Sequence, residues 1–206
     1  MASQQSTIAE KEPLMADLKE RAMRISPEVC DPGHHKLVWG EGSLVAEVAF
    51  VGEAPGDKEE AEGRPFVGQA GKLLDRELKQ LGINRNDLWI TNAVKCRPVK
   101  ESAGILVNRT PTAKEIKNWL GPLMEELEII HPHIIVCLGA VAAKALINKS
   151  FALTKERGLW FDGPFDSRII ATFHPAYILR QVGDNWDIAM EMFRQDLRQA
   201  LKLPLT

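Results

Sequence analysis

The sequence predicts a three-layer α/β/α fold around a mainly parallel sheet, and two observations lead to that prediction. Short apolar runs alternate along the chain with longer segments whose apolar residues recur at helical spacing. The run Val48 to Val51 is uniformly apolar before Gly52, which is typical of a parallel strand buried on both faces. With 206 residues and 45% hydrophobic content, the chain is long enough to bury a sizeable core as one domain.

Five segments are predicted to be strands. Each is a short run dominated by apolar, β-branched or aromatic residues, and most are followed by glycine or by a polar residue. In chain order they are Val48 to Val51, Leu88 to Thr91, Ile134 to Leu138, Leu159 to Phe161 and Arg168 to Phe173.

The intervening segments predict helices. Thr112 and Glu115 form a capping-box pattern, which predicts that a helix begins there and runs toward Ile130. A loose helical pattern over Thr7 to Arg24, interrupted by Pro13, predicts a helix within an N-terminal extension that covers residues 1–29. The other expected helices span Gln69 to Leu81, Ala140 to Ile147 and Trp186 to Leu201.

Side chains suited to chemistry follow the carboxyl ends of these strands. Open α/β sheets bind their ligands outside the carboxyl ends of the strands, so we expect the loops there to gather along one edge. The four loops are Gly52 to Gly71, Asn92 to Pro111, the segment from Gly139 onward, and His174 to Arg180.

The charge balance does not by itself indicate a polyanionic partner. The chain has 26 basic and 28 acidic residues, a formal net charge of −2, which is compatible with an ordinary mixed surface. Any attraction to nucleic acid must therefore be local. The basic residues in or beside the four loops are Arg64, Lys95, Arg97, Lys100, Arg109 and Arg180.

The cysteines and the N-terminus favour a cytoplasmic protein. Three cysteines at unrelated spacings argue against a disulfide framework, and Cys137 is expected to be a small core residue. No apolar stretch is long enough to span a membrane, and the segment Met1 to Lys11 is polar and acidic, unlike a secretory signal.

Five ordered motifs between about Gly40 and Arg180 resemble the family 4 branch of the uracil-DNA glycosylase superfamily. They are Gly52-Glu53-Ala54-Pro55-Gly56 with Pro65-Phe66-Val67-Gly68, Thr91 to Pro98, Asn108-Arg109-Thr110-Pro111, Leu138-Gly139-Ala140, and His174 to Arg180. The resemblance implies a single domain over 1–206 with a four-stranded central sheet. It also implies a monomeric, monofunctional repair glycosylase that acts on uracil in DNA at the nucleoid, hydrolyses the N-glycosidic bond and leaves an abasic site.

The same resemblance implies roles for individual residues. Phe66 would stack on a flipped uracil, Asn92 would pair with its N3 hydrogen and O4, and His174 would stabilise the departing base. Glu53 would favour the cationic sugar and orient water. The remaining implied base contacts are Gly52, Ala54 and Asn108, and the implied DNA contacts are Arg64, Lys95, Arg109, Pro175, Tyr177 and Arg180.

Several residues of these motifs also have a structural interpretation. Phe66 can be a core aromatic, Asn92 a turn cap and His174 a structural residue, while Leu179 can be helix core. Asp57, Glu59 and Glu60 are interpreted as a solvated acidic face rather than as catalytic helpers.

Two departures from the better-known glycosylases leave alternatives open. Ala54 stands where those enzymes carry an aspartate, so the general base is not assigned. The loop 99–107 is longer than the compact family 4 form and resembles an insertion of a related branch that traps DNA covalently, although Asn108 replaces the histidine of that branch. The alternatives are a glycosylase for hypoxanthine or xanthine, a uracil-DNA reader without turnover, and a nucleotide-binding domain at Gly52 to Gly56 that lacks a Walker signature.

The iron-sulfur cluster typical of family 4 is not expected here. Such a cluster uses four cysteines, of which only Cys30 and Cys96 have matches in this chain, and Asn118 stands at the position of a fourth. His34 and His35 are the alternative metal ligands to test. We expect no metal and no cofactor, with the loop held by packing around Trp39 and Trp119.

Overall fold

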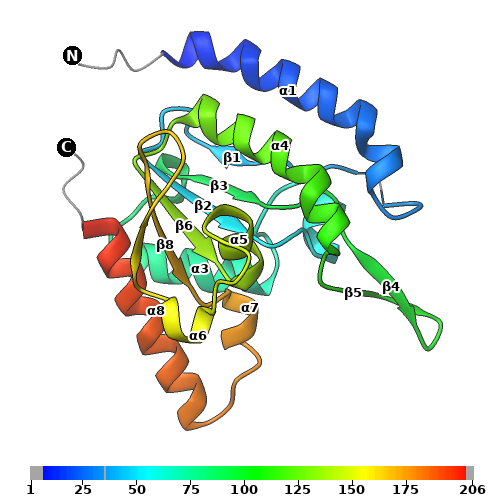
Figure 1. Ribbon diagram of the computed structural model, residues 1–206. Helices are drawn as coiled ribbons and strands as arrows, with labels where there is room; N and C mark the ends of the chain where they lie inside the picture. The colour runs from blue at the N-terminus through cyan, green and yellow to red at the C-terminus, as the bar shows by residue number, and fades with distance from the viewer. Residues whose placement is uncertain (1–6, 35, 203–206) are drawn as a thin grey trace.

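In the computed structural model, residues 7–34 and 36–202 are described, and they form a sheet covered on both faces by helices (Figure 1). The sheet has six strands in the order β1-β3-β2-β6-β8-β7. The central four strands are mutually parallel, as the sequence predicts, while β1 and β7 pair antiparallel at the two edges. The strands are β1 (Glu41–Gly42), β2 (Val48–Gly52), β3 (Trp89–Asn92), β6 (Ile134–Leu138), β7 (Trp160–Asp162) and β8 (Arg168–Thr172).

Two apolar clusters separate the layers. Alternate residues of β2 point to opposite faces, so Ala49 and Val51 join one cluster while Val48 and Phe50 join the other. The first cluster packs against α1 (Ile8–Val29), α4 (Ala113–Ile130) and α5 (Ala140–Leu146). The second packs against α3 (Gln69–Gln80), α7 (Pro175–Ile178) and α8 (Asp184–Lys202).

The predicted helices are confirmed, with shifts at their ends. The capping box of Thr112 and Glu115 is present at the start of α4, and Pro13 lies inside α1 without ending it. The sequence did not predict five short elements outside the 99–108 segment, because each is too short to show a periodicity. They are α2 (Asp57–Glu62), η1 (Arg85–Asp87), α6 (Leu153–Glu156), α7 and β1.

The segment expected to be a long loop is a β-hairpin instead. Strands β4 (Val99–Ser102) and β5 (Ile105–Asn108) pair antiparallel and project from the body of the protein (Figure 1). Both turn residues have positive φ, 52° at Ala103 and 76° at Gly104, which is the conformation of a tight two-residue hairpin turn.

The expectation that the cysteines form no disulfide is wrong for one pair. Cys30 follows α1, Cys96 lies in the loop after β3, and the structure joins them in a disulfide with a Cα–Cα distance of 5.9 Å. The pair is separated by 66 residues, so its proximity depends on how α1 packs against α4 rather than on sequence spacing. Cys137 is buried in β6 as predicted, and burial raises the pKa of its thiol.

No helix within residues 7–34 and 36–202 has the length and apolar character needed to cross a membrane.

Candidate active site

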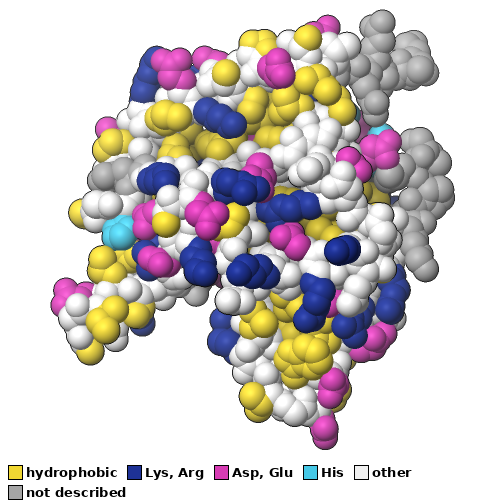
Figure 2. Space-filling model, turned by 180° about the vertical axis from the view of Figure 1, so that it is seen from behind, with side chains coloured by type: hydrophobic (Ala, Val, Ile, Leu, Met, Phe, Trp, Pro, Cys, Tyr) yellow, Lys and Arg dark blue, Asp and Glu magenta, His cyan; other side chains and the backbone are white. Residues whose placement is uncertain are grey.

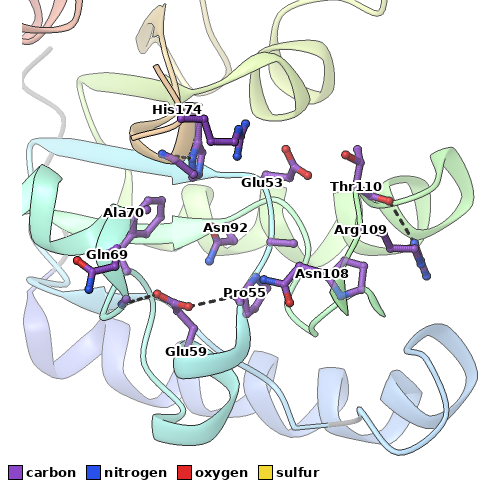
Figure 3. Close-up of a pocket in the computed structure, with 17 residues that line it drawn as sticks. Glu53, Pro55, Glu59, Gln69, Ala70, Asn92, Asn108, Arg109, Thr110 and His174 are labelled. Carbon is purple, nitrogen blue, oxygen red and sulfur yellow. Dashed lines mark hydrogen bonds between the residues drawn. The ribbon is translucent and has the colours of Figure 1, made fainter. Parts of the chain in front are cut away.

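The carboxyl ends of the central strands meet at a pocket of about 360 Å³, a size suited to a small organic ligand. One wall comes from the loops after β2, another from the segment between β3 and α4, and a third from His174, Ala176 and Arg180, which lie in α7 or beside it. Glu53, Asn92 and His174 are arranged around the same space (Figure 3). Gly139 supports this arrangement from behind, because a Cβ there would lie 3.0 Å from Cβ of His174.

Phe66 presents an aromatic ring to this pocket. The ring is 5% exposed, and its centroid lies 5.7 Å from that of the His174 ring. Gly52 allows the ring to approach, because a Cβ at that position would lie 2.5 Å from Cζ of Phe66 and 2.4 Å from Oδ1 of Asn92. Gly52 does not line the pocket itself but leaves room for two residues that do.

The backbone of Phe66 has the strained value φ 54°, and two side chains hold the segment that contains it. The carboxylate of Glu59 accepts hydrogen bonds from the N–H groups of Val67 (3.0 Å) and Gly68 (2.7 Å). From the other side, Arg85 donates to the carbonyl oxygens of Pro65 (2.7 Å) and Phe66 (3.4 Å). The position of the aromatic ring is therefore set by contacts on both sides of its loop.

Glu59 and Glu60 are not the solvated acidic face that the sequence suggested. Glu59 also accepts from the N–H of Gly56 at 3.2 Å, so it joins the two glycine-rich loops. Glu60 is half-buried and contacts Nδ1 of His34 at 2.8 Å and Nη1 of Arg97 at 3.2 Å. Neither function was visible from the sequence, because the partners are backbone groups of a loop or residues far away in the chain.

Asn92 ends β3 and is 2% exposed. Its backbone carbonyl oxygen accepts a hydrogen bond from Nζ of Lys95 at 2.7 Å. This bond fixes the backbone of Asn92, while its side-chain amide lines the pocket. The expected position of Asn92 at a strand end is confirmed.

Lys95 is fully buried, so its assignment as a DNA contact is wrong. Its ammonium group donates to Oγ1 of Thr91 at 2.7 Å and pairs with the equally buried carboxylate of Glu126. It also lies 5.2 Å from the centre of the Trp39 ring. Burial lowers the pKa of Lys95, and the charge of Glu126 opposes that shift.

His174 caps the short helix α7 and points its ring into the pocket region. Its Nδ1 accepts a hydrogen bond from the N–H of Ala176 at 3.1 Å, so Nδ1 carries no proton in this arrangement. Burial and the nearby charge of Arg180 lower the pKa of His174 to about 4. At neutral pH the ring is therefore uncharged and keeps an N–H donor at Nε2.

Glu53 lies across the pocket from the imidazole (Figure 3). Burial raises the pKa of its carboxyl group, whereas a hydrogen bond with Thr110 and the charge of Arg180 act in the opposite direction. The pocket thus places a carboxylate and a neutral imidazole on opposite sides of one space.

Ala54, Asn108 and Arg180 also line the pocket. Oδ1 of Asn108 accepts a hydrogen bond from Nε of Arg97 at 2.7 Å. Arg180 and Tyr177 are exposed beside the pocket, where a phosphate group could reach them.

Three other residues assigned to DNA contact do not support that assignment. Pro175 is buried at the start of α7. Arg109 lines the pocket, but its guanidinium group is engaged by Asp31, Glu115 and backbone carbonyls. Arg64 pairs with Glu41 at 2.8 Å in a separate hollow. The charges and motif positions of Arg64 and Arg109 suggested contact with DNA, but carboxylates elsewhere in the chain pair with both guanidinium groups.

The described part of the chain does not assemble a metal site. No group of three or more His, Cys, Asp or Glu side chains within residues 7–34 and 36–202 is placed to hold a metal ion. Cys30 and Cys96 are bonded to each other, and His34 contacts Glu60. His35, the other alternative ligand, lies outside the described residues.

Comparisons with known proteins agree with this geometry. The family model described as "Uracil DNA glycosylase superfamily" matches residues 39–201. A Type-4 uracil-DNA glycosylase of Thermotoga maritima is 41% identical over 171 residues, which cover 82% of this chain and 85% of that protein. A Type-4 enzyme of Archaeoglobus fulgidus is 40% identical, covering 68% of this chain and 70% of its own. A Type-5 uracil-DNA glycosylase of Pyrobaculum aerophilum is 32% identical, covering 79% and 76% respectively. The chain therefore belongs to the uracil-DNA glycosylase superfamily.

Proposed function

We propose that this protein is a DNA repair enzyme that removes uracil from DNA by hydrolysing its N-glycosidic bond. The observation that carries the proposal is one pocket lined by an aromatic ring, an amide, a neutral imidazole and a carboxylate, namely Phe66, Asn92, His174 and Glu53. The similarity to Type-4 uracil-DNA glycosylases over most of the chain supports it.

In the proposed reaction, the uracil nucleotide leaves the base stack and enters the pocket. Phe66 stacks on the base, and the amide of Asn92 accepts from its N3–H and donates to O4. Cytosine has the reverse donor and acceptor pattern at those atoms, so the amide in this orientation selects uracil.

The C1′–N1 bond then breaks, and its electron pair leaves with the base. Nε2–H of His174 donates to O2, where negative charge develops, and it can do so without carrying a charge itself. The carboxylate of Glu53 favours the cationic sugar and orients a water molecule. The water oxygen bonds to C1′ and gives one proton to the carboxylate of Glu53, and this proton then passes to the uracil anion, so that an abasic sugar and neutral free uracil remain.

Arg180 and Tyr177 are proposed to hold the DNA backbone at the pocket mouth, because both are exposed next to it. We further propose that the protein acts as a monomer in the cytoplasm, at the nucleoid.

The residues present do not fit the iron-sulfur cluster of family 4, and we propose that the enzyme works without one. The whole chain has three cysteines, two of which are bonded to each other, while Cys137 is buried in β6. Trp119, beside the position of the fourth ligand, is a fully buried core side chain. Iron and sulfide analysis of the purified protein tests this proposal, and stoichiometric iron would refute it.

A nucleotide-binding role at Gly56 is disfavoured by the same geometry. The N–H groups of Gly56, Val67 and Gly68 donate to Glu59, so a carboxylate of the protein already occupies the donors that a phosphate would need.

The proposed activity is tested with end-labelled duplexes that contain one uracil, hypoxanthine or xanthine. Strand cleavage of the uracil duplex only after alkali treatment is the expected result. Preferential cleavage of a purine-containing duplex would instead support a different deaminated base as the substrate. A band shift that survives denaturation would indicate covalent trapping.

The pH dependence of the rate follows from the two titrating groups. Glu53 must be ionised and His174 neutral, so protonation of either group at low pH slows the reaction. Because burial raises the pKa of Glu53 while that of His174 is lowered to about 4, Glu53 takes up its proton first as the pH falls. Single-turnover rates should therefore be flat near neutral pH and fall as the pH drops through the pKa of Glu53. A fall with a midpoint near 6.5, the ordinary value for histidine, that persists in Glu53→Gln would contradict the low pKa of His174.

Replacing Glu59 by glutamine should weaken uracil binding, because Glu59 positions the loop that carries Phe66. The glutamine NH₂ group would face a backbone N–H, so at least one buried donor loses its acceptor, which costs about 1–3 kcal/mol. We expect KM for uracil DNA and the inhibition constant of free uracil to rise roughly tenfold together, since about 1.4 kcal/mol corresponds to that factor. Glu62→Gln, an exposed change on the same helix α2, is the control and should leave both constants unchanged. Unchanged constants in Glu59→Gln would refute the positioning role.

A further inference from the structure

The β4–β5 hairpin is a direct extension of the pocket wall. Its first residue pair joins Val99 to Asn108, and Pro98, Asn108 and Arg109 all line the pocket. Both strands of the hairpin therefore join the body of the protein beside the pocket that a nucleotide must enter. Figure 1 shows it projecting away from the sheet and its covering helices.

The base of the hairpin is anchored by several hydrogen bonds. The N–H of Val99 donates to Asp31 at 2.7 Å, and Nε of Arg109 donates to the carbonyl oxygen of Val99 at 2.8 Å. The guanidinium group of Arg109 also pairs with Asp31 at 2.8 Å, and the backbone N–H of Arg109 donates to the carbonyl oxygen of Pro98 at 3.1 Å. These contacts fix the direction of the hairpin relative to the pocket.

The tip of the hairpin exposes large aliphatic side chains. Ile105 is 66% exposed and Leu106 is 51% exposed, and they point to opposite faces because they are adjacent in β5. Hydrophobic side chains are visible at the end of this projection in the space-filling view (Figure 2). A two-stranded ribbon has no core of its own that could bury them.

The segment on the opposite side of the pocket mouth also exposes apolar side chains beside a basic residue. Arg180 lines the pocket there, and Tyr177 and Leu179 are 39% and 45% exposed next to it. DNA that delivers a nucleotide to the pocket must lie between this segment and the hairpin. Lys100 on β4 adds a positive charge on the hairpin side.

We propose that the hairpin is a second DNA-contacting element, with Ile105 and Leu106 packing on the DNA that flanks the flipped nucleotide. This inference rests on the proposed function. Apolar side chains of DNA-binding proteins pack into the minor groove and between base steps, so an aliphatic tip suits DNA that is already distorted by base flipping.

The length of the hairpin defines where its tip makes contact. Four residues per strand at roughly 3.3 Å each give a reach of about 13 Å. With the hairpin running along the DNA from the pocket wall, its tip would lie about four nucleotides from the flipped base, because successive nucleotides along a strand are spaced by about 3.4 Å. DNA that ends before this distance cannot touch it.

The test compares the wild type with the double variant Ile105→Ser/Leu106→Ser on a short and a long uracil duplex. The short duplex carries about two base pairs on each side of the uracil and is kept paired by a covalent interstrand cross-link at each end, whereas the long one carries about eight, so that only the latter spans the reach of the hairpin. On the long duplex, we expect the variant to raise KM roughly tenfold, a loss near 1.4 kcal/mol, with kcat unchanged. On the short duplex, the two proteins should have the same KM.

Val45→Ser is the matched control, because Val45 is also an exposed aliphatic residue but precedes the amino end of β2, at the sheet edge opposite to the pocket. Equal KM values for the wild type and the double variant on the long duplex would overturn the inference, and so would an equal loss on both duplexes. Dissociation constants for the same duplexes carrying an abasic analogue test the contact without catalysis. If the wild type excises no uracil, the proposed function fails, and these constants still decide whether the hairpin binds DNA.

Discussion

Replacing Glu53 by glutamine is expected to lower kcat for uracil excision by roughly 10²–10⁴-fold, the usual range for the loss of a general acid or base. Glutamine preserves the shape of the side chain but cannot balance the cationic sugar or accept a proton from water. Glu53 faces the pocket opposite His174, and it is the carboxylate whose pKa burial raises in this site. Single-turnover excision rates on a uracil duplex measure the effect.

Two comparisons separate this effect from a loss of folding or binding. The dissociation constant of Glu53→Gln for uracil DNA should remain close to that of the wild type. Glu47→Gln, an exposed change just before β2, should retain full activity. An excision rate of Glu53→Gln within a few-fold of the wild type would show that another group orients the water.

Replacing Lys95 by methionine is expected to lower the free energy of unfolding by about 3–5 kcal/mol, because removing one partner leaves an uncompensated buried charge. That charge belongs to Glu126, which is fully buried beside Lys95. The carbonyl oxygen of Asn92 would also lose a hydrogen-bond donor. Urea unfolding followed by tryptophan fluorescence measures the change.

The double variant Lys95→Met/Glu126→Met provides the control. Removing both charges should cost less than the sum of the two single changes, because the isolated buried charge is then absent. If Lys95 contacted DNA, Lys95→Met would instead weaken DNA binding and leave the unfolding free energy within about 1 kcal/mol of the wild type. That result would contradict the structural role assigned here.

The central sheet was predictable because its strands are buried on both faces. Runs such as Val48 to Val51 and Ile134 to Leu138 are almost continuously apolar, and the structure places them at the centre of the sheet. Motif order likewise predicted which loops meet, and Glu53, Phe66, Asn92 and His174 do line one pocket.

The errors concern polar residues whose partners are distant in sequence. Lys95 is basic and follows a motif strand, but its neighbours Val94 and Cys96 are apolar, a local signal of burial that could have been used. The role of Glu59 depends on backbone N–H groups of a loop whose conformation no periodicity specifies. A glycine three residues before this glutamate, at Gly56, was the available hint of a helix start.

Other features required the three-dimensional packing. The Cys30–Cys96 pair forms because α1 extends along α4 and ends near the loop after β3, which the spacing of cysteines does not reveal. The hairpin has a signal in its sequence, since Ala103-Gly104 lies between two segments containing β-branched residues, but Ala-Gly is a weaker turn signal than Asn-Gly or Asp-Gly.

The most direct test of the account is the amount of free uracil released per protein molecule from an excess of uracil-containing duplex. We predict that released uracil rises well above one equivalent, with a matching number of abasic sites in the DNA. Release that stops at or below one equivalent, together with a protein–DNA adduct that survives denaturation, would contradict a hydrolytic glycosylase. No release at all would contradict the proposed chemistry of Glu53, Asn92 and His174.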